Sequence, residues 1–435
     1  MQSVPLSFQQ RFHWDNSQRL SDLNLNFPFA LFITGALNIE RLRESFEALI
    51  RRHGALRTRI AVAHGEPRQI VDVPSRFRLE VVPRPQDLTS EVEGYLNCPF
   101  DLVGGKLFRA RLLRLSRREH ILLVCAHHLI MDAYSVSFLS DELWHSYSSR
   151  APQLPVLHTQ YSDYALRQMQ GHPSWLASHG RYWSERLANA EPLRLPTERS
   201  LAVDGTTSVG NFQIEFEGTL TAAIDAAARR WKTMPAMLVL TAFIAALSRW
   251  SKQSDFIVPI VFSGRDDPDT LGLIGFFSYV LLLRMQIEGA RDFADLRDRV
   301  NREFCRACAG EDHGRVVTGL LADLPAREGM KLFSTGFNWL SMSSGELAGA
   351  PSQAILNRLQ GELEVTAFPF RFLPRYLNTS SRPDSPLSDV PALGLQVTQG
   401  SAVEASLLYS AGSLSPGSIA VFAENLLLLL ESAVA

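Results

Sequence analysis

The sequence predicts two α+β domains. With 435 residues, of which 46% are hydrophobic and 20% charged, the chain is long enough for two substantial hydrophobic cores. Helix-like and strand-like patterns are mixed in both halves, and no segment recurs at a fixed period. The run Arg150 to Pro155 breaks regular structure between the halves. We therefore expect a first domain at residues 1–175 and a second at residues 176–435.

The first half opens with a strand and then a helix. Ala30 to Thr34 is apolar and reads as a strand. The helix is expected at Ile39 to Arg52, because Asn38 can cap its first turn and four apolar residues share one face. These four are Leu42, Phe46, Leu49 and Ile50.

A strand pair follows later in the same half. Leu107 to Leu115 and Ile121 to Ala126 are apolar runs that flank the polar turn Ser116 to Glu119. A helix is expected from about Ser135 to Tyr147. The segment between the second strand and this helix is therefore a loop.

The second half is also mixed. An almost wholly apolar helix is expected at Met234 to Trp250, and it should be central to the second core. Strands are expected at the alternating residues Phe212, Ile214 and Phe216, at Ile257 to Val261, and at Tyr279 to Gln286.

Composition excludes several classes of function. The 43 basic and 45 acidic residues give a net charge of −2 without a Lys/Arg run, so neither nucleic acid nor an anionic membrane is expected as a partner. Apolar stretches such as Met234 to Leu247 fall short of the roughly 18 to 20 residues of a membrane span. The N-terminus lacks the pattern of a signal peptide. We expect a cytoplasmic monomer.

The four cysteines do not form a disulfide framework, and reduced thiols are expected. Cys305-Arg-Ala-Cys308 has the spacing of half a zinc or redox site. No second Cys/His pair has matching spacing, and the surrounding sequence is helical, so ordinary helix residues are the favoured interpretation.

The segment with the clearest chemistry is His120 to Asp132. Its apolar strand delivers two adjacent histidines, His127 and His128, and then Asp132 into a loop. Side chains alternate along a strand, so the histidines should point to opposite faces. One imidazole is then available to a cleft, and the other to structural hydrogen bonds.

Other chemistries lack their signatures. A metal site at this loop would need both histidines and the aspartate on one face, and no further ligand cluster supports it. Glycine-rich phosphate loops are absent, so ATP-dependent activation is not expected. A Gly-x-Ser-x-Gly elbow is also absent, which disfavours a thioesterase.

The motifs of the first half resemble those of nonribosomal peptide synthetase condensation domains, in the chloramphenicol acetyltransferase-like superfamily. His127-His128-Leu-Ile-Met-Asp132-Ala133 is similar to the signature His-His-x-x-x-Asp-Gly, with alanine in place of glycine. Further similar segments are Arg52-His53-Gly54-Ala55-Leu56-Arg57-Thr58, the spacing of Ser7, Gln10 and Trp14 with Phe12 in place of an arginine, Cys98 to Leu102, Tyr161 to Ala165, and Tyr182 to Leu187.

The second half resembles the family less closely. Ser263-Gly264-Arg265 and Ile274-Gly275-Phe276-Phe277 are similar to the segment beneath the acceptor side of the family's channel. Ser278-Tyr279-Val280 stands where Val-Asn-Thr is usual. The resemblance implies an acceptor-side channel that involves Ser278, Tyr279, His313, Asn338 and Trp339.

The resemblance implies a fold and a mode of action. Each half is expected to have a chloramphenicol acetyltransferase-like fold, the two forming a V-shaped pseudo-dimer with a central tunnel. The resemblance extends from about Ser7 to the last helix, so we expect a free-standing unit. The donor is expected on the phosphopantetheine of an acyl or peptidyl carrier protein supplied in trans, with no permanently bound cofactor.

The roles in the loop follow in part from this resemblance. The resemblance implies that the second histidine, His128, is the catalytic base. An imidazole with a pKa near ~6.5 suits this role, because it can accept a proton from a hydroxyl or position an amine. His127 is either a second base or a hydrogen-bonded core group, and the alternation favours the core. Asp132 either completes a relay with His128 or pairs with an arginine; the resemblance favours pairing, with Arg57 and Arg284 as the expected partners.

Two further histidines have less direct interpretations. His53 lies at the end of a predicted helix, where capping or salt-bridge support is favoured over catalysis. His313 lies in a degenerate motif and is a candidate for the acceptor channel.

Three functions remain open. The first is a condensation enzyme that transfers an acyl or peptidyl group from a carrier-bound thioester to an amine or hydroxyl acceptor, with chain release in natural-product biosynthesis as one outcome. The second is an acyl-CoA-dependent acyltransferase of the same superfamily. The third is a non-catalytic platform that recruits carrier proteins, which the intact His-His-x-x-x-Asp pattern disfavours.

Overall fold

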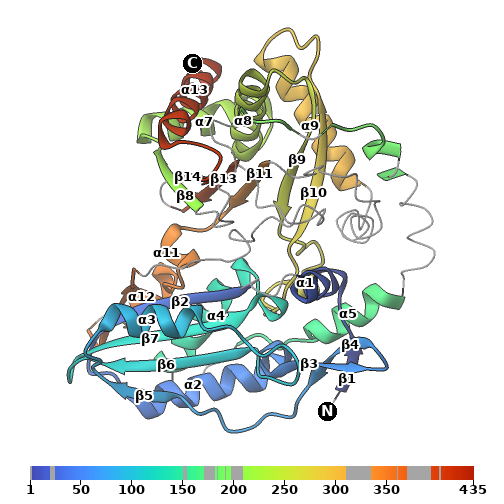
Figure 1. The fold of residues 1–435 in the computed structure, drawn as a ribbon. Coiled ribbons are helices and arrows are strands. Elements are labelled where there is room, and N and C mark those ends of the chain that lie inside the picture. The colour runs from blue at the N-terminus through green and yellow to red at the C-terminus, as the bar shows by residue number, and fades with distance from the viewer. Residues whose placement is uncertain are drawn as a thin grey trace. The chain divides into compact units, whose positions relative to one another are not determined.

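The computed structural model describes residues 2–19, 25–149, 154–170, 182–183, 185–191, 193–196, 209–309, 335–359, 361–369, 393–400 and 403–435. The chain forms two compact units (Figure 1). Unit 1 comprises Met1–His172, Ser263–Ser278 and Ser344–Pro374; unit 2 comprises Pro173–Phe262, Tyr279–Ser343 and Arg375–Ala435.

Unit 1 is built on a five-stranded sheet. Its order is β12 (Leu363–Ala367), β2 (Asn26–Gly35), β7 (Glu119–His127), β6 (Phe108–Arg114) and β5 (Glu80–Pro83). All neighbours are antiparallel except β5 and β6. The predicted strand pair is therefore confirmed as β6 and β7.

The central strand β7 is buried on both faces. Leu122, Val124 and Ala126 belong to the core that contains apolar residues of α2 (Ile39–Arg52) and α4 (Ala133–Ser148). The alternate residues Ile121, Leu123 and Cys125 pack with residues of α3 (Leu88–Asn97). This double cover fixes the register of β7, because a slip of one residue would exchange its two faces.

The remaining elements of unit 1 lie around this sheet. A second sheet has the order β1 (Gln2–Pro5), β4 (Glu66–Val71) and β3 (Thr58–Ala63). The other helices are α1 (Phe8–Arg19), α5 (Tyr161–Gln170), α11 (Ser344–Leu347) and α12 (Gln353–Leu359), with short 3₁₀ helices η1 (Gly54–Arg57), η2 (His128–Ile130) and η3 (Pro268–Thr270).

The units differ from the continuous halves 1–175 and 176–435 that the sequence indicated. Strand β12 pairs antiparallel with β2, with Val365 opposite Ile33, so a late segment completes the sheet of unit 1. The segment Ser263–Ser278 contributes Ile274 and Phe277 to the core of the same unit. Two segments of the second half thus fold with the first.

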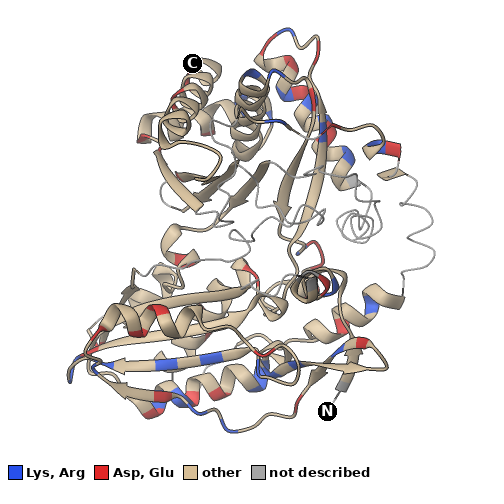
Figure 2. Ribbon diagram, in the orientation of Figure 1, with Lys and Arg blue, Asp and Glu red and all other residues tan. Residues whose placement is uncertain are grey.

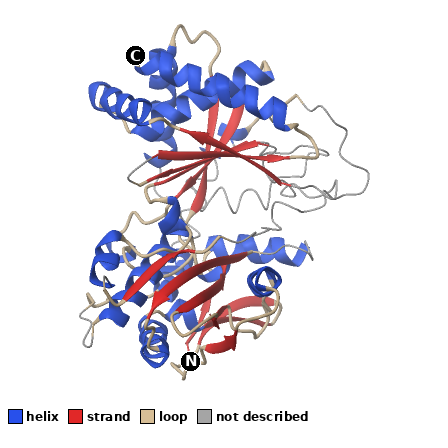
Figure 3. Ribbon diagram, turned by 90° about the vertical axis from the view of Figure 1, so that its left-hand side faces the viewer, coloured by secondary structure: helices blue, strands red, loops and turns tan. Residues whose placement is uncertain are grey.

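Unit 2 contains a six-stranded mixed sheet. Its order is β10 (Tyr279–Gln286), β9 (Asp255–Phe262), β11 (Thr335–Leu340), β13 (Leu393–Gln399), β14 (Val403–Ser410) and β8 (Val209–Glu215). Its longer helices are α7 (Gly218–Trp231), α8 (Pro235–Ser251), α9 (Phe293–Ala309) and α13 (Pro416–Val434). They gather on one side of the sheet (Figure 3). The α+β prediction is confirmed, since each unit combines helices with a sheet.

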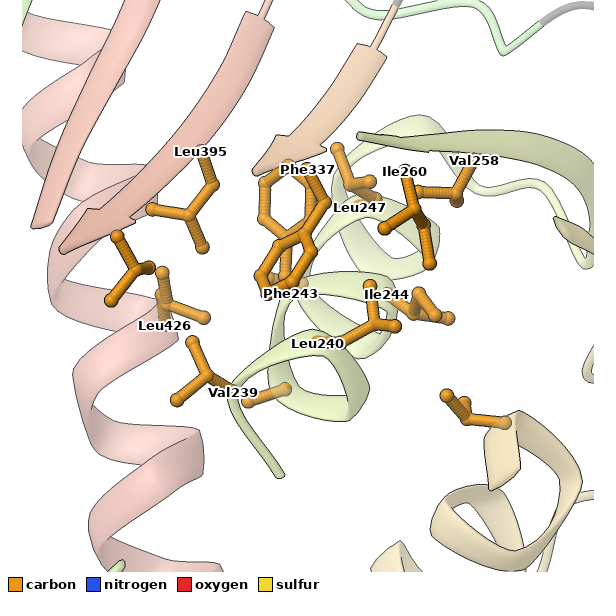
Figure 4. Packing of buried hydrophobic residues seen from close by; sticks show 14 of the residues in the cluster. Val239, Leu240, Phe243, Ile244, Leu247, Val258, Ile260, Phe337, Leu395 and Leu426 are labelled. Carbon is orange, nitrogen blue, oxygen red and sulfur yellow. The ribbon is translucent and has the colours of Figure 1, made fainter. Parts of the chain in front are cut away.

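Helix α8 is the centre of the second core, as its composition predicted. Val239, Leu240, Phe243 and Leu247 are almost wholly buried (Figure 4). The ring of Phe243 lies 6.3 Å from that of Phe337 on β11, and the helix also packs against α13. Lys252 ends α8 in the left-handed conformation.

The sequence analysis found no apolar stretch long enough to span a membrane, but helix α13 is an exception. It has 19 residues and a mean hydropathy of 1.5 over its most apolar 18-residue window. By length and composition alone, it is therefore long and apolar enough to cross a membrane. Among the described residues, no other single helix is long and apolar enough. Helices α7 and α8 reach this length only if they are counted together as one span with a bend of 103°. Ile419, Phe422 and Leu426 of α13 lie in the core of unit 2, so part of its apolar surface packs within the protein.

The cysteines and charges agree with the sequence analysis. Cys305 and Cys308 are exposed residues of α9, and Cys125 is buried in β7. Basic and acidic residues are interspersed along the described elements of both units (Figure 2).

Candidate active site

The candidate site lies within unit 1, where β7 ends. His127 is the last residue of β7 and is opposite Asn26 of β2. The chain then turns through η2, which begins at His128 and is closed by a hydrogen bond from the Met131 N–H to the His128 carbonyl oxygen. Asp132 follows as the N-cap of α4. The loop is therefore held between a buried strand and a capped helix.

The imidazole of His128 has a fixed orientation. Its Nδ1 lies 2.7 Å from the Met131 carbonyl oxygen. A carbonyl oxygen can only accept, so Nδ1 carries the proton and Nε2 has a lone pair. Within the described part of the chain Nε2 has no hydrogen-bond partner. This nitrogen is available as a base.

Among the described residues, three aromatic rings lie around His128, which is half-buried. The Phe276 ring lies 4.3 Å away between centroids, the Phe27 ring 5.0 Å away, edge to face, and the His13 ring 5.2 Å away, nearly parallel. Burial lowers the pKa of His128 below its ordinary 6.5, although the Met131 hydrogen bond and the charge of Asp132 raise it in part. His128 is therefore neutral near pH 7.

His127 is in a different environment. Its side chain is buried, with 3% exposed, and the Phe100 ring lies edge-on at 6.1 Å. Its Nδ1 accepts a hydrogen bond of 3.2 Å from the Leu129 N–H, which helps to shape η2. Burial, followed by the neighbouring His128, lowers its pKa to about 3. His127 is thus a neutral, hydrogen-bonded core group, in agreement with the favoured interpretation.

Asp132 is fully engaged in structural contacts. Its Oδ1 accepts from the Ser135 N–H at 2.8 Å and from Nη2 of Arg265 at 3.0 Å, and its Oδ2 accepts from the Phe277 N–H at 3.1 Å. Only 1% of the Asp132 side chain and 4% of the Arg265 side chain are exposed. Since Nδ1 of His128 is bound to a carbonyl, the relay interpretation of Asp132 is wrong and the ion-pair interpretation is confirmed.

The expected partners of Asp132 were wrong. Arg57 instead donates to the backbone carbonyl of Asp72 at 2.9 Å. Arg284 lies on β10 in unit 2 and pairs with Asp255 at 2.8 Å. Arg265 is the partner because the segment Ser263–Ser278 folds with unit 1 and brings its guanidinium to the start of α4.

Arg265 also organises its own segment. Its Nη1 donates to the carbonyl oxygens of Thr270 at 2.8 Å and Leu273 at 2.9 Å. Its guanidinium carbon lies 4.3 Å from the Phe277 ring centroid and 5.1 Å from that of Phe138. One buried cation therefore fixes both the histidine loop and the segment that holds Phe276.

The expected acceptor-side residues are divided between the units. Ser278 ends a segment of unit 1, Tyr279 begins β10 of unit 2, and Asn338 and Trp339 lie on β11. His313 lies outside the described residues. The acceptor channel stays a prediction.

His53 has the supporting role that its position indicated. It is the C-cap of α2, and its Nε2 lies 2.7 Å from a carboxylate oxygen of Glu142 on α4. The contact ties α2 to α4.

Ala133 needs no unusual backbone conformation. It is the first residue of α4, and it is not among the described non-glycine residues with positive φ. The glycine of the signature is therefore not required here for a left-handed turn.

Sequence reasoning missed the proximity of His13 to His128. His13 lies between Phe12 and Trp14 of the first recognised motif, and no spacing rule singled it out. Phe276 was noted as part of a motif but was not placed at His128, because their contact joins segments far apart in the chain.

Comparison with known proteins shows the family to which the chain belongs. The family model described as "Condensation domain" matches residues 1–346. The chain is 33% identical over 328 residues to a linear gramicidin synthase of Brevibacillus parabrevis; the match covers 71% of this chain and 6% of that much longer protein.

Solved structures show the same fold. The X-domain from teicoplanin biosynthesis superposes with a TM-score of 0.80 at 20% identity, covering 100% of this chain and 95% of that one. The SgcC5 protein from Streptomyces globisporus superposes with a TM-score of 0.73 at 23% identity, covering 99% and 98%. The chain belongs to the condensation-domain family of nonribosomal peptide synthetases, which forms amide or ester bonds.

Proposed function

We propose that the chain transfers an acyl or peptidyl group from the phosphopantetheine thioester of a carrier protein to an amine or hydroxyl acceptor, with His128 as the base. The observation that supports this most directly is the 2.7 Å contact between Nδ1 of His128 and the Met131 carbonyl oxygen. It leaves a neutral Nε2 with its lone pair available to an incoming nucleophile.

The reaction needs few groups from the protein. The acceptor oxygen or nitrogen attacks the thioester carbonyl carbon while Nε2 of His128 takes its proton. The new C–O or C–N bond forms, the C–S bond breaks, and the leaving thiolate recovers the proton from the imidazolium. A thioester is already activated, so neither ATP nor an enzyme nucleophile is required.

The ring environment of His128 suits this cycle. Burial beside Phe276 and Phe27 keeps the imidazole neutral before attack. The nearby charge of Asp132 favours the imidazolium that forms during transfer. The imidazole can therefore accept and return one proton.

We propose a small soluble acceptor, with release of the finished chain. Its support is the departure at Ser278-Tyr279-Val280 from the usual Val-Asn-Thr, beside the segment that positions Phe276. A carrier-bound acceptor that extends the chain is the alternative outcome, and the product distinguishes the two.

The test is intact-protein mass spectrometry of an acyl-loaded carrier, supplied as a separate protein, with a panel of free amines and alcohols. We expect enzyme-dependent loss of the acyl mass with a particular nucleophile, and a matching amide or ester product. Acyl-CoA and acyl-pantetheine are offered in parallel. Faster transfer from CoA than from the carrier would favour the CoA-dependent enzyme, and no transfer from any donor would overturn the proposal.

A further inference from the structure

His13 is an ionisable side chain beside the proposed base that the mechanism above does not use. It lies on α1, and its ring is inclined by 27° to that of His128 at a centroid distance of 5.2 Å. The Phe276 ring lies 4.9 Å from it and the Phe12 ring 5.4 Å from it. The two imidazoles therefore contact each other and the same Phe276 ring.

Helix α1 is fixed to the histidine loop by hydrogen bonds. Nε2 of Gln10 donates to the Leu129 carbonyl oxygen at 2.8 Å, and Nε2 of Gln9 donates to the Phe277 carbonyl oxygen at 3.1 Å. His13 is three and four residues after these glutamines, so it lies one turn further on the same face of the helix. Its position relative to His128 is thus set by buried contacts.

The side chain of His13 is half-buried. Within the described part of the chain, its ring nitrogens have no hydrogen-bond partner. Burial, followed by the neighbouring His128 and His127, holds the pKa of His13 well below 6.5. Near pH 7 it is a neutral ring with one N–H donor and one lone pair. Neutral histidine donors of this kind can polarise a substrate carbonyl.

The separation of the two rings fits a shared reaction centre. In acyl transfer, the base lies about 3 Å from the nucleophile, and the oxyanion donor lies about 3 Å from the carbonyl oxygen. With the ring centroids 5.2 Å apart and the rings inclined by 27°, nitrogens on the ring edges can contact neighbouring atoms of one substrate. His128 then faces the nucleophile, and His13 faces the carbonyl oxygen.

We propose that His13 is a second catalytic residue, which donates an imidazole N–H to the thioester carbonyl oxygen as that oxygen gains negative charge. This role rests on the proposed acyl transfer and adds oxyanion stabilisation to it. The covalent steps are unchanged: His13 keeps its proton throughout, and His128 alone moves the proton of the nucleophile.

Two substitutions separate this role from packing. His13→Phe keeps a ring of similar size against His128 but removes both nitrogens, whereas His13→Gln supplies a neutral N–H donor without the ring. Under single-turnover conditions with a loaded carrier, we expect His13→Phe to slow transfer about 100-fold, as for loss of one oxyanion donor. His13→Gln should recover at least tenfold of that loss, and carrier affinity should be unchanged in both.

Transfer by His13→Phe within threefold of the wild-type rate would overturn the proposal. So would a loss of rate in His13→Gln as large as that in His13→Phe, because the ring itself would then be the required feature.

A measurement without turnover keeps this test separate from the proposed function. Acetyl-aminopantetheine, in which an amide nitrogen replaces the thioester sulfur, presents the carbonyl but transfers slowly. In protein labelled with ¹⁵N at histidine, we expect its binding to shift the resonances of His13 and His128. The resonances of His158, an exposed residue shortly before α5, should not shift. A shift at His128 without one at His13 would overturn the role of His13. Shifts at both, with no transfer from any donor, would instead count against the proposed function.

Discussion

Asp132 and Arg265 form a buried ion pair with an Oδ1 to Nη2 distance of 3.0 Å, although they lie 133 residues apart in the sequence. The pair joins the start of α4, directly after the histidine loop, to the segment that carries Phe276. The candidate site is therefore completed by a piece of chain from the second half of the sequence.

Removing one partner of this pair should be costly. We expect Arg265→Ala to lower the free energy of unfolding by about 3–5 kcal/mol, because the carboxylate of Asp132 is left buried without its cation. Chemical denaturation measures this change. The matched control is Arg11→Ala, which removes an exposed arginine that pairs with Asp15 and Glu66 and should cost at most about 1 kcal/mol. Equal losses in the two variants would contradict the structural role of Arg265.

The tautomer of His128 can be measured directly. Because Nδ1 donates to the Met131 carbonyl, we expect long-range ¹H–¹⁵N spectra at pH 7.5 to show a protonated Nδ1 and an unprotonated Nε2 for this ring. A spectrum with the proton on Nε2 would rule out the proposed base.

The acid limb of the pH–rate profile should report the burial of His128. The group must be neutral to accept a proton, and burial lowers its pKa, so transfer should fall only at a pH below 6.5. We expect Phe276→Ala to expose the ring and move this limb to higher pH. Phe276→Leu keeps an apolar side chain over the ring and should leave the acid limb near its wild-type position. An identical acid limb in the wild type and both variants would show that Phe276 does not control the pKa of His128.

Acid should destabilise the fold through His127. The unfolded chain binds a proton near pH 6.5, whereas the folded His127 does so only at about pH 3, so stability is complete above pH 6.5 and falls as the pH decreases through this window. One such group gives a slope of about 1.4 kcal/mol per pH unit. His127→Asn should make the dependence shallower by about this amount in urea denaturation from pH 6.5 to 4. An unchanged slope would contradict the burial of a neutral imidazole.

Restoring glycine at position 133 should have a small effect. Ala133 begins α4 without a positive φ, so Ala133→Gly removes no strain and should lower the unfolding free energy by at most about 1 kcal/mol. A clear gain in stability would show that the alanine is strained.

Local patterns predicted most of the elements and the histidine loop. The helix Ile39–Arg52 was predicted with its bounds because its apolar spacing and the Asn38 cap are both local signals, and Asn38 does accept from the Arg41 N–H. Strand β10 was equally clear from its apolar run. These elements depend on neighbours in the sequence.

The partners of the loop could not be predicted in the same way. The sequence contains many arginines, and the choice of Arg265 over Arg57 or Arg284 depends on which segments fold into unit 1. The contact of His13 with His128 likewise depends on how α1 packs, through Gln10, against η2. Tertiary placement, which no local pattern encodes, decides both.

The most direct test of the account compares single-turnover loss of the acyl mass from a loaded carrier by the wild-type protein, His128→Ala and the exposed-site control His158→Ala. Circular dichroism and melting temperature establish that all three are folded. We predict that the wild type and His158→Ala unload the carrier at similar rates in the presence of the acceptor, and that His128→Ala leaves it loaded. Unloading by folded His128→Ala at the wild-type rate would contradict the assignment of His128 as the base.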